Sequence, residues 1–129
     1  MTRDQQRLAD YLTHIQVAIE RIHRYVEDID ETDFLQSEMA QDAVIRNFEI
    51  IGEASHNIEQ NYPTFALEHP ELPLAFAYQM RNAVAHGYFQ IDLEIVWKTV
   101  HADLPGLHEQ VLELLQNLPH DDMTEGLRP

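Results

Sequence analysis

Apolar residues recur in alternating steps of four and three along the first thirty positions of the chain. They are Leu8, Leu12, Ile15, Ile19, Ile22, Val26 and Ile29. A repeat of about 3.5 residues places such positions on one side of a helix, so the pattern predicts a long amphipathic helix. Thr2 and Gln5 have the spacing of a capping box at its start. The polar run at residues 28–33 is expected to end the helix in a turn.

A second helix is predicted from about Glu38 to Gln60, with Ser37 as its N-cap. Its apolar face consists of Val44, Phe48, Ile51 and Ile58. The tripeptide at 61–63, Asn-Tyr-Pro, should end this helix because proline cannot continue it. The prolines after it predict a loop over residues 62–73, with room for one helical turn.

Two further helices are predicted in the remaining part of the chain. The third is expected from about Pro73 to His86, where Gly87 suits a left-handed C-terminal cap. The fourth begins after Asp92 as its N-cap, and the pair at 105–106, Pro-Gly, must kink or split it. Its inward positions are Ile95, Val96, Thr99 and Val100 before the break and Leu107, Val111, Leu114, Leu115 and Leu118 after it.

These four amphipathic segments with short connections predict an all-α protein. The expected architecture is an up-and-down four-helix bundle whose last helix is kinked or split. Residues 1–118 are expected to form one helical domain, followed by a polar C-terminal tail at 119–129. A helical bundle by itself does not specify any chemistry.

Composition narrows the possible functions. The 129 residues carry a formal net charge of −15, from 8 basic and 23 acidic residues. Such a charge argues against broad, non-specific binding to nucleic acids. The chain has no cysteine, which excludes disulfides and thiolate metal sites. The sequence has neither a signal-peptide pattern nor an apolar run of about 20 residues, so we expect a cytoplasmic protein without a membrane span.

The segment R-N-A-V-A-H-G-Y, from Arg81 to Tyr88, gathers polar residues at the end of the predicted third helix. Asn82 and His86 are four residues apart and share a helical face, where the amide could orient the imidazole. Arg81 lies roughly 140° around the helix from His86, but its long side chain can swing toward the same end. A turn at Gly87 could bring the phenol of Tyr88 back beside His86.

Arginine, histidine and tyrosine together suit cleavage of a phosphodiester without a metal ion. Histidine, with an ordinary pKa of about 6.5, can accept or donate a proton at neutral pH. Arginine offers a planar, permanently charged fork that matches phosphate oxygens. RNA contains its own nucleophile, the 2′-hydroxyl, so cleavage needs only proton transfers and charge stabilisation. By spacing alone, however, the commoner role of such an Arg81 and His86 is structural, capping a helix or pairing with acidic residues.

The same segment resembles the R-N-x-x-x-H-x-Y signature of HepT-like toxins in the HEPN superfamily. The stretch A-V-I-R-N-F-E-I-I-G-E-A, residues 43–54, is similar to the other block typical of that family. The run F-Q-I-D-L-E-I-V-W-K-T-V-H-A-D-L-P-G-L resembles the family's sequence on the C-terminal side of the motif. The similarity covers about residues 8–118 in matching order, which makes it far more specific than the short motif.

The resemblance implies a helical-bundle homodimer in which the motifs of both subunits meet in one cleft. It also implies metal-independent endoribonuclease activity, with no cofactor. Arg81 and His86 carry over as the catalytic residues, and Asn82 carries over as a supporting polar residue. Tyr88 carries over as the tyrosine to which a cognate MntA-type nucleotidyltransferase antitoxin adds AMP.

A stripe of basic residues lies one position away from the apolar seam of the first helix. Its members are Arg3, Arg7, His14, Arg21 and Arg24. This stripe is the best candidate for contact with an RNA backbone or an acidic partner. The alternative is a solvated face on which the arginines pair with Glu20 and Glu27 at helical spacing.

Other polar and aromatic residues are expected to be structural. Opposite charges form a ladder along the second helix at Asp42, Arg46, Glu49 and Glu53, although Glu53 could orient Arg81 from a neighbouring helix. The histidines other than His86 show no metal-ligand spacing, so no metal site is predicted. Trp97 is expected to pack in the core, because apolar residues surround it at helical spacing.

A second class of function stays open at this point. The chain could be a non-catalytic helical subunit that docks a separate nucleotidyltransferase. The intact Arg81 and His86 favour the enzyme, whereas the net charge of −15 favours the docking subunit.

Overall fold

The apolar stripe at the N-terminus forms one long helix, as predicted. The computed structural model describes residues 3–72, 74, 78 and 93–118, and its helix α1 spans Arg3–Val26. The stripe residues within α1 are all buried, namely Leu8, Leu12, Ile15, Ile19, Ile22 and Val26. Ile29, just beyond the helix, is partly buried against the same core. Thr2, the first residue of the predicted capping box, lies outside the described residues.

The turn predicted over residues 28–33 is wrong from Glu31 onward, where the short helix α2 (Glu31–Gln36) begins. A reciprocal capping box starts this helix. The Asp33 backbone N–H donates to Asp30 Oδ1 at 2.8 Å, and the Asp30 N–H donates to Asp33 Oδ2 at 3.3 Å. Phe34 is fully buried. Turn-forming aspartates therefore act here as helix caps, and one buried aromatic side chain holds the helix on the bundle.

The second predicted helix is confirmed as α3, Glu38–Asn61. Its N-cap is Ser37, whose Oγ accepts a hydrogen bond from the Ala40 backbone N–H at 3.1 Å. The helix ends before the Tyr62–Pro63 pair, and a further short helix, α4 (Pro63–Glu68), comes next with proline in its first turn. The single helical turn expected between residues 62 and 73 is therefore present.

The last predicted helix is split into α6 (Leu93–Ala102) and α7 (Leu104–Asn117). The break lies at Asp103, because Pro105 belongs to the first turn of α7, where its missing N–H costs nothing. Val96, Thr99 and Val100 are buried as expected, but the Ile95 side chain is 53% exposed. Of the predicted third helix, 73–86, only Leu74 and Tyr78 are described, and its proposed cap Gly87 and the N-cap Asp92 lie outside the described residues.

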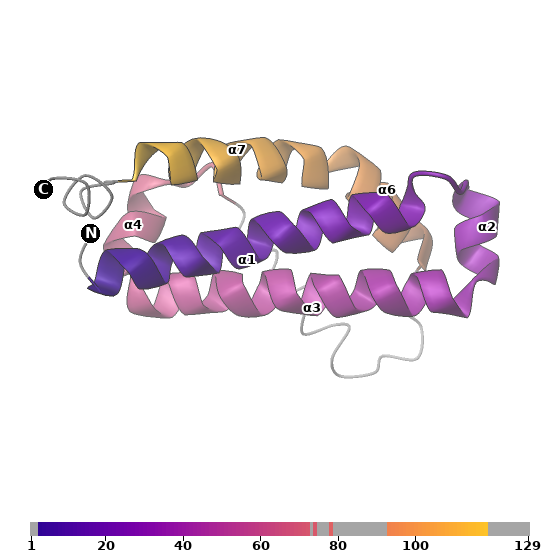
Figure 1. Ribbon diagram of the computed structural model, residues 1–129, viewed down its shortest axis with the longest axis horizontal. Coiled ribbons are helices and arrows are strands. Elements are labelled where there is room, and N and C mark those ends of the chain that lie inside the picture. The colour runs from indigo at the N-terminus through magenta and orange to yellow at the C-terminus, as the bar shows by residue number, and fades with distance from the viewer. Residues whose placement is uncertain (1–2, 73, 75–77, 79–92, 119–129) are drawn as a thin grey trace, which may run out of the picture.

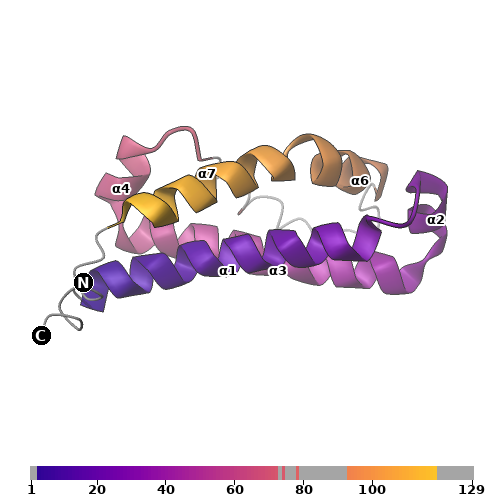
Figure 2. The same ribbon diagram turned by 45° about the horizontal axis from the view of Figure 1, so that its top comes forward.

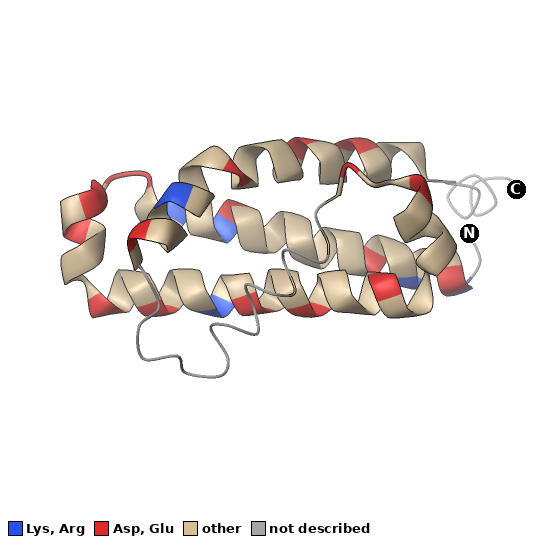
Figure 3. Cartoon of the chain, turned by 180° about the vertical axis from the view of Figure 1, so that it is seen from behind, with Lys and Arg blue, Asp and Glu red and all other residues tan. Residues whose placement is uncertain are grey.

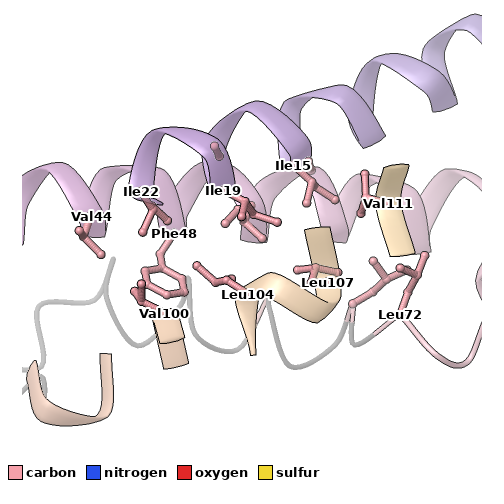
Figure 4. Close-up of a cluster of buried hydrophobic side chains, with 14 of the residues drawn as sticks. Ile15, Ile19, Ile22, Val44, Phe48, Leu72, Val100, Leu104, Leu107 and Val111 are labelled. Carbon is pink, nitrogen blue, oxygen red and sulfur yellow. The ribbon is translucent and has the colours of Figure 1, made fainter. Parts of the chain in front are cut away.

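The described helices form two layers around one core. α1 and α3 lie side by side and antiparallel, and the consecutive helices α6 and α7 run along α1 in the direction opposite to it (Figures 1 and 2). α2 closes one end of the molecule, and α4 lies at the other end (Figure 1). Buried side chains from both layers form the core. Figure 4 shows part of it, with labels on Ile15, Ile19, Ile22, Val44, Phe48, Leu72, Val100, Leu104, Leu107 and Val111.

The described part of the chain contains helices and no strand, which confirms the predicted all-α class. None of the helices in this part is both long enough and apolar enough to cross a membrane. α1 and α3 each keep one surface outside the core, and polar residues lie on these surfaces.

Candidate functional site

The residues predicted to carry chemistry lie in the segment between Tyr78 and Leu93. Arg81, Asn82, His86 and Tyr88 are all outside the described residues. The described residues on either side of this segment belong to the walls of the bundle.

Tyr78 is the described residue nearest to the motif on its N-terminal side. Its ring stacks on the imidazole of His56 from α3, with ring centroids 4.1 Å apart and an angle of 15° between the planes. Both side chains are half-buried. The stack joins the chain three residues before Arg81 to the C-terminal part of α3. Sequence reasoning assigned neither residue a role, because a single aromatic pair far apart in sequence leaves no periodic signal.

A groove of about 420 Å³ lies between α1 and α3. Its lining residues are Tyr11, His14, Arg46, Glu49, Ile50, Glu53, Ala54 and Asn57. The ring of Tyr11 meets His14 and Tyr62 edge to face, each with centroids 6.4 Å apart. The Tyr62 hydroxyl donates to the backbone oxygen of Asp4 at 2.7 Å, which ties the end of α3 to the start of α1. The groove thus combines a fixed aromatic edge with side chains of both charges.

The charge ladder predicted on α3 includes an ion pair between Arg46 and Glu49. Arg46 Nη1 lies 4.0 Å from Glu49 Oε1, and the Arg46 side chain is 72% exposed. An exposed pair of this kind contributes at most about 1 kcal/mol to stability. The Arg46 guanidinium is therefore accessible at the groove to an anionic or polar ligand.

The block at residues 43–54 divides between the core and the groove. Val44, Phe48 and Ile51 are buried in the core. Arg46 and Glu53, on the other side of the helix, line the groove. One helical segment therefore supplies both packing and the polar wall, as expected for an amphipathic helix.

Residues 15–114 match the family described as ribonuclease HepT-like. The chain belongs to the HepT-like ribonuclease family. A probable ribonuclease HepT of Thermococcus cleftensis is 44% identical over 98 residues, which cover 76% of this chain and 86% of that protein. A candidate RNase of Caldanaerobacter subterraneus subsp. tengcongensis is 34% identical over 106 residues, covering 82% of this chain and 92% of its own.

A longer relative shows the same similarity within a larger protein. It is the gamma-glutamylcyclotransferase and candidate RNase of Methanocaldococcus jannaschii, 39% identical over 108 residues. The match covers 84% of this chain but 47% of that protein, so this chain spans about half of it. No solved structure is significantly similar to the chain.

The basic stripe expected on the first helix of this HepT-like chain divides into two pairs. Arg3 and Arg7 lie near the start of α1, and Arg21 and Arg24 lie near its end; all four are exposed. Fourteen residues separate Arg7 from Arg21, which corresponds to about 21 Å along a helix. The stripe therefore offers two small cationic areas instead of one continuous patch.

Histidines gather where α1 meets α6 and α7. His108 Nε2 donates to Glu20 Oε2 at 2.9 Å, and Gln16 Nε2 donates to the same oxygen at 3.1 Å. These hydrogen bonds hold the pKa of Glu20 below its usual value. Burial, helped by the charges of His108 and His101, lowers the pKa of His23. Within the described residues no group of histidines and carboxylates has the geometry of a metal site.

Trp97 is partly buried against the core, which confirms its predicted structural place. It contacts Phe34 with ring centroids 5.3 Å apart and His101 with centroids 4.2 Å apart. The contact with Phe34 connects α6 to α2.

Asn47, inside the family-typical block on α3, is a further residue that periodicity did not identify. It is 4% exposed, and its Nδ2 donates to the Ala43 backbone oxygen at 2.8 Å. Its Oδ1 is buried without a partner among the described residues. Buried polar atoms usually have partners, because leaving one unpaired costs about 1–3 kcal/mol.

Proposed function

We propose that this chain is an RNA-cleaving enzyme that acts in the cytoplasm as the toxin of a toxin–antitoxin pair. The observation that carries the proposal is that the match to the HepT-like ribonuclease family, residues 15–114, includes an intact R-N-A-V-A-H-G-Y segment. Relatives of similar length are named as ribonucleases. Because the chain belongs to this family, we favour a catalytic role for Arg81 and His86 over a purely structural one.

In the proposed reaction, His86 exchanges a proton with the 2′-hydroxyl or with the leaving 5′-oxygen. The 2′-oxygen attacks the adjacent phosphorus, the bond to the 5′-oxygen breaks, and the products are a 2′,3′-cyclic phosphate and a 5′-hydroxyl. Arg81 stabilises the charge that develops on the phosphorane oxygens. Asn82 orients the imidazole of His86, and no metal or cofactor takes part.

One motif supplies one imidazole and one guanidinium, whereas the reaction needs a base, an acid and a charge stabiliser. We therefore propose a homodimer that pools two motifs in one cleft, where the second His86 or Tyr88 completes the proton transfers. Light scattering at micromolar concentration should then give about twice the chain mass of 15.1 kDa. A monomer that cleaves RNA at full rate would contradict the shared cleft.

RNA can bind a protein of net charge −15 only where basic side chains lie close together. The two exposed arginine pairs of α1, Arg3 with Arg7 and Arg21 with Arg24, are the proposed contacts for RNA or for an acidic part of a partner. Replacing each pair by glutamine should weaken RNA binding and reduce its salt dependence. Unchanged binding in both double variants would leave the arginines as a solvated face.

The experiment that tests the reaction class uses purified protein without antitoxin. RNA should be cut in the presence of EDTA, DNA of the same sequence should survive, and mass spectrometry should identify a cyclic phosphate at the new 3′ end. Activity that depends on added Mg²⁺, or a linear 5′-phosphate product, would mean that the reaction class is wrong.

The second candidate function is a non-catalytic subunit that docks a nucleotidyltransferase, and the strong negative charge favours it. Expression without a partner separates the two candidates. The enzyme should arrest growth, and His86→Ala should restore it. A docking subunit should leave growth unchanged, both as the wild type and as the His86→Ala variant.

A further inference from the structure

A second groove, of about 480 Å³, opens at the end of the bundle where α1, α2 and α3 meet. Its apolar lining comes from Tyr25 at the end of α1, from Ile29 just after that helix, and from Met39, Ala40 and Ala43 at the start of α3. This volume falls within the roughly 300–1,000 Å³ of typical ligand pockets. The groove shares no lining residue with the groove at Arg46.

The apolar side chains of this groove are unusually exposed. Met39 is 84% exposed and Tyr25 is 41% exposed, and Leu35 on the adjacent α2 is 36% exposed. Three of the five large hydrophobic residues that are exposed in the described part of the chain therefore lie at this end. Contiguous apolar surface on a folded protein usually marks an interaction site.

Acidic residues are frequent in the segment that forms this end of the bundle, and together they are called the rim of the groove. Those exposed at this end are Glu27, Asp28, Asp30, Asp33, Glu38 and Asp42. Asp33 itself lines the groove. Residues 27–42 contain no lysine, arginine or histidine, and the nearest cation in the sequence is the exposed Arg24, directly before Tyr25 in α1. Figure 3 shows the resulting concentration of acidic ribbon around α2.

The wall that α2 contributes is held in place before any partner arrives. Phe34 is fully buried, and Gln41 Nε2 on α3 donates to the backbone oxygens of Phe34 and Leu35 at 3.0 and 3.1 Å. The capping box of Asp30 and Asp33 fixes the other end of α2. A surface that is already ordered loses little entropy on binding.

We propose that this acid-rimmed groove binds a basic amphipathic helix of a partner protein. The apolar side chains of that helix, spaced three and four residues apart, would enter between Tyr25 and Met39. Its lysines and arginines would face the carboxylates of the rim, which also speeds association.

The charge of the rim selects this occupant over the others. RNA and anionic lipid both present negative charge, which the carboxylates repel. A second copy of the chain placed by a two-fold axis would bring the same acidic rim against itself. The inference is independent of the ribonuclease proposal, because it uses no residue of the R-N-A-V-A-H-G-Y segment.

The test uses a synthetic helical peptide of about five turns, with leucine on one face and lysine on the other, labelled with fluorescein. Fluorescence anisotropy with the full chain should show saturable binding that weakens with added salt. A matched peptide with glutamate in place of lysine should bind on the order of tenfold more weakly or not at all. Equal binding of both peptides would overturn the proposal.

Two matched variants locate the site. Met39→Gln removes the most exposed apolar side chain of the groove, and Leu67→Gln removes one of similar exposure, 81%, on α4 at the opposite end of the molecule. Met39→Gln should weaken binding of the lysine peptide on the order of tenfold. Leu67→Gln should leave binding unchanged, and circular dichroism should show that both variants keep their helix content.

A second pair of variants tests the rim. The double variant Glu38→Gln/Asp42→Asn should weaken the lysine peptide and flatten its salt dependence, whereas Glu109→Gln/Glu113→Gln on α7 removes as much charge elsewhere and should not. Equal effects of the two double variants would mean that the peptide responds only to the net charge of the chain. That result would overturn the proposed site. If Met39→Gln instead halves the mass seen by light scattering, the groove is an interface between copies of this chain, and the proposed partner is wrong.

Discussion

The imidazole of His56 and the phenol of Tyr78 stack with their ring centroids 4.1 Å apart and their planes within 15° of parallel. The contact fixes the chain three residues before Arg81 onto α3. This half-buried pair is therefore the described contact nearest in sequence to the N-terminal side of the motif.

His56→Ala should therefore lower both stability and activity. Losing an aromatic pair costs about 0.5–1.5 kcal/mol, and the rate of RNA cleavage should fall several-fold because the segment after Tyr78 loses its anchor. Tyr78→Phe keeps the stack and should retain both properties. Urea denaturation and a cleavage assay measure the two effects, and wild-type values for His56→Ala would show that the stack does not position the segment.

The anchoring of α2 gives a second prediction. Phe34 is fully buried, whereas its neighbour Leu35 is 36% exposed. Phe34→Ala should lower the free energy of unfolding by about 3–5 kcal/mol, the usual cost of removing a buried phenylalanine side chain. Leu35→Ala should cost less than about 1 kcal/mol. Similar losses for both variants in urea denaturation would contradict the packing of α2 on the core.

The histidine contacts between α1 and α7 predict a loss of stability in acid. The pKa of His23 is lowered in the folded state, first by burial, so the unfolded chain binds a proton more readily below pH 6.5. The pKa of Glu20 is also lowered, chiefly by its hydrogen bond from His108, so its contribution is lost as pH falls below 4.5. Both shifts make the free energy of unfolding decrease as the pH is lowered.

His23→Gln should flatten this dependence between pH 6.5 and 5. Urea midpoints measured across this range provide the test. A wild-type urea midpoint that rises as the pH is lowered would contradict the predicted loss of stability in acid.

Control of the enzyme is expected to act at Tyr88. An AMP group there would add negative charge and bulk two residues from His86, where it would compete for Arg81 and repel RNA. Intact-mass spectrometry after incubation with ATP and the cognate nucleotidyltransferase should show added AMP on the wild type and none on Tyr88→Phe. Neutralised toxicity without any change in mass would favour steric blocking by a bound antitoxin.

The long helices could be predicted because their signals are periodic and local. The spacing from Leu8 to Val26 and the N-cap at Ser37 specify α1 and the start of α3, and the structure confirms both. The split of the last helix was also predicted from Pro105, although the break lies two residues earlier, at Asp103. Proline is tolerated in a first turn, so its position marks the beginning of the second segment and not the break itself.

The features that sequence reasoning missed depend on tertiary contacts. α2 has only six residues, too few for a helical period, and it is held by the burial of Phe34. The stack of Tyr78 on His56 and the groove around Met39 join positions far apart in the sequence. The motif was identified by resemblance, and the chemistry assigned to Arg81 and His86 stays a prediction.

The measurement that tests the central claim most directly is the rate of RNA cleavage by three purified proteins, the wild type, Arg81→Ala and His86→Ala. The wild type should cleave RNA in EDTA, and each variant should be slower by on the order of 10²-fold or more, the scale of a lost general acid–base or charge-stabilising group. All three should have the same helical circular dichroism spectrum. Cleavage by folded His86→Ala at the wild-type rate would contradict the proposed active site.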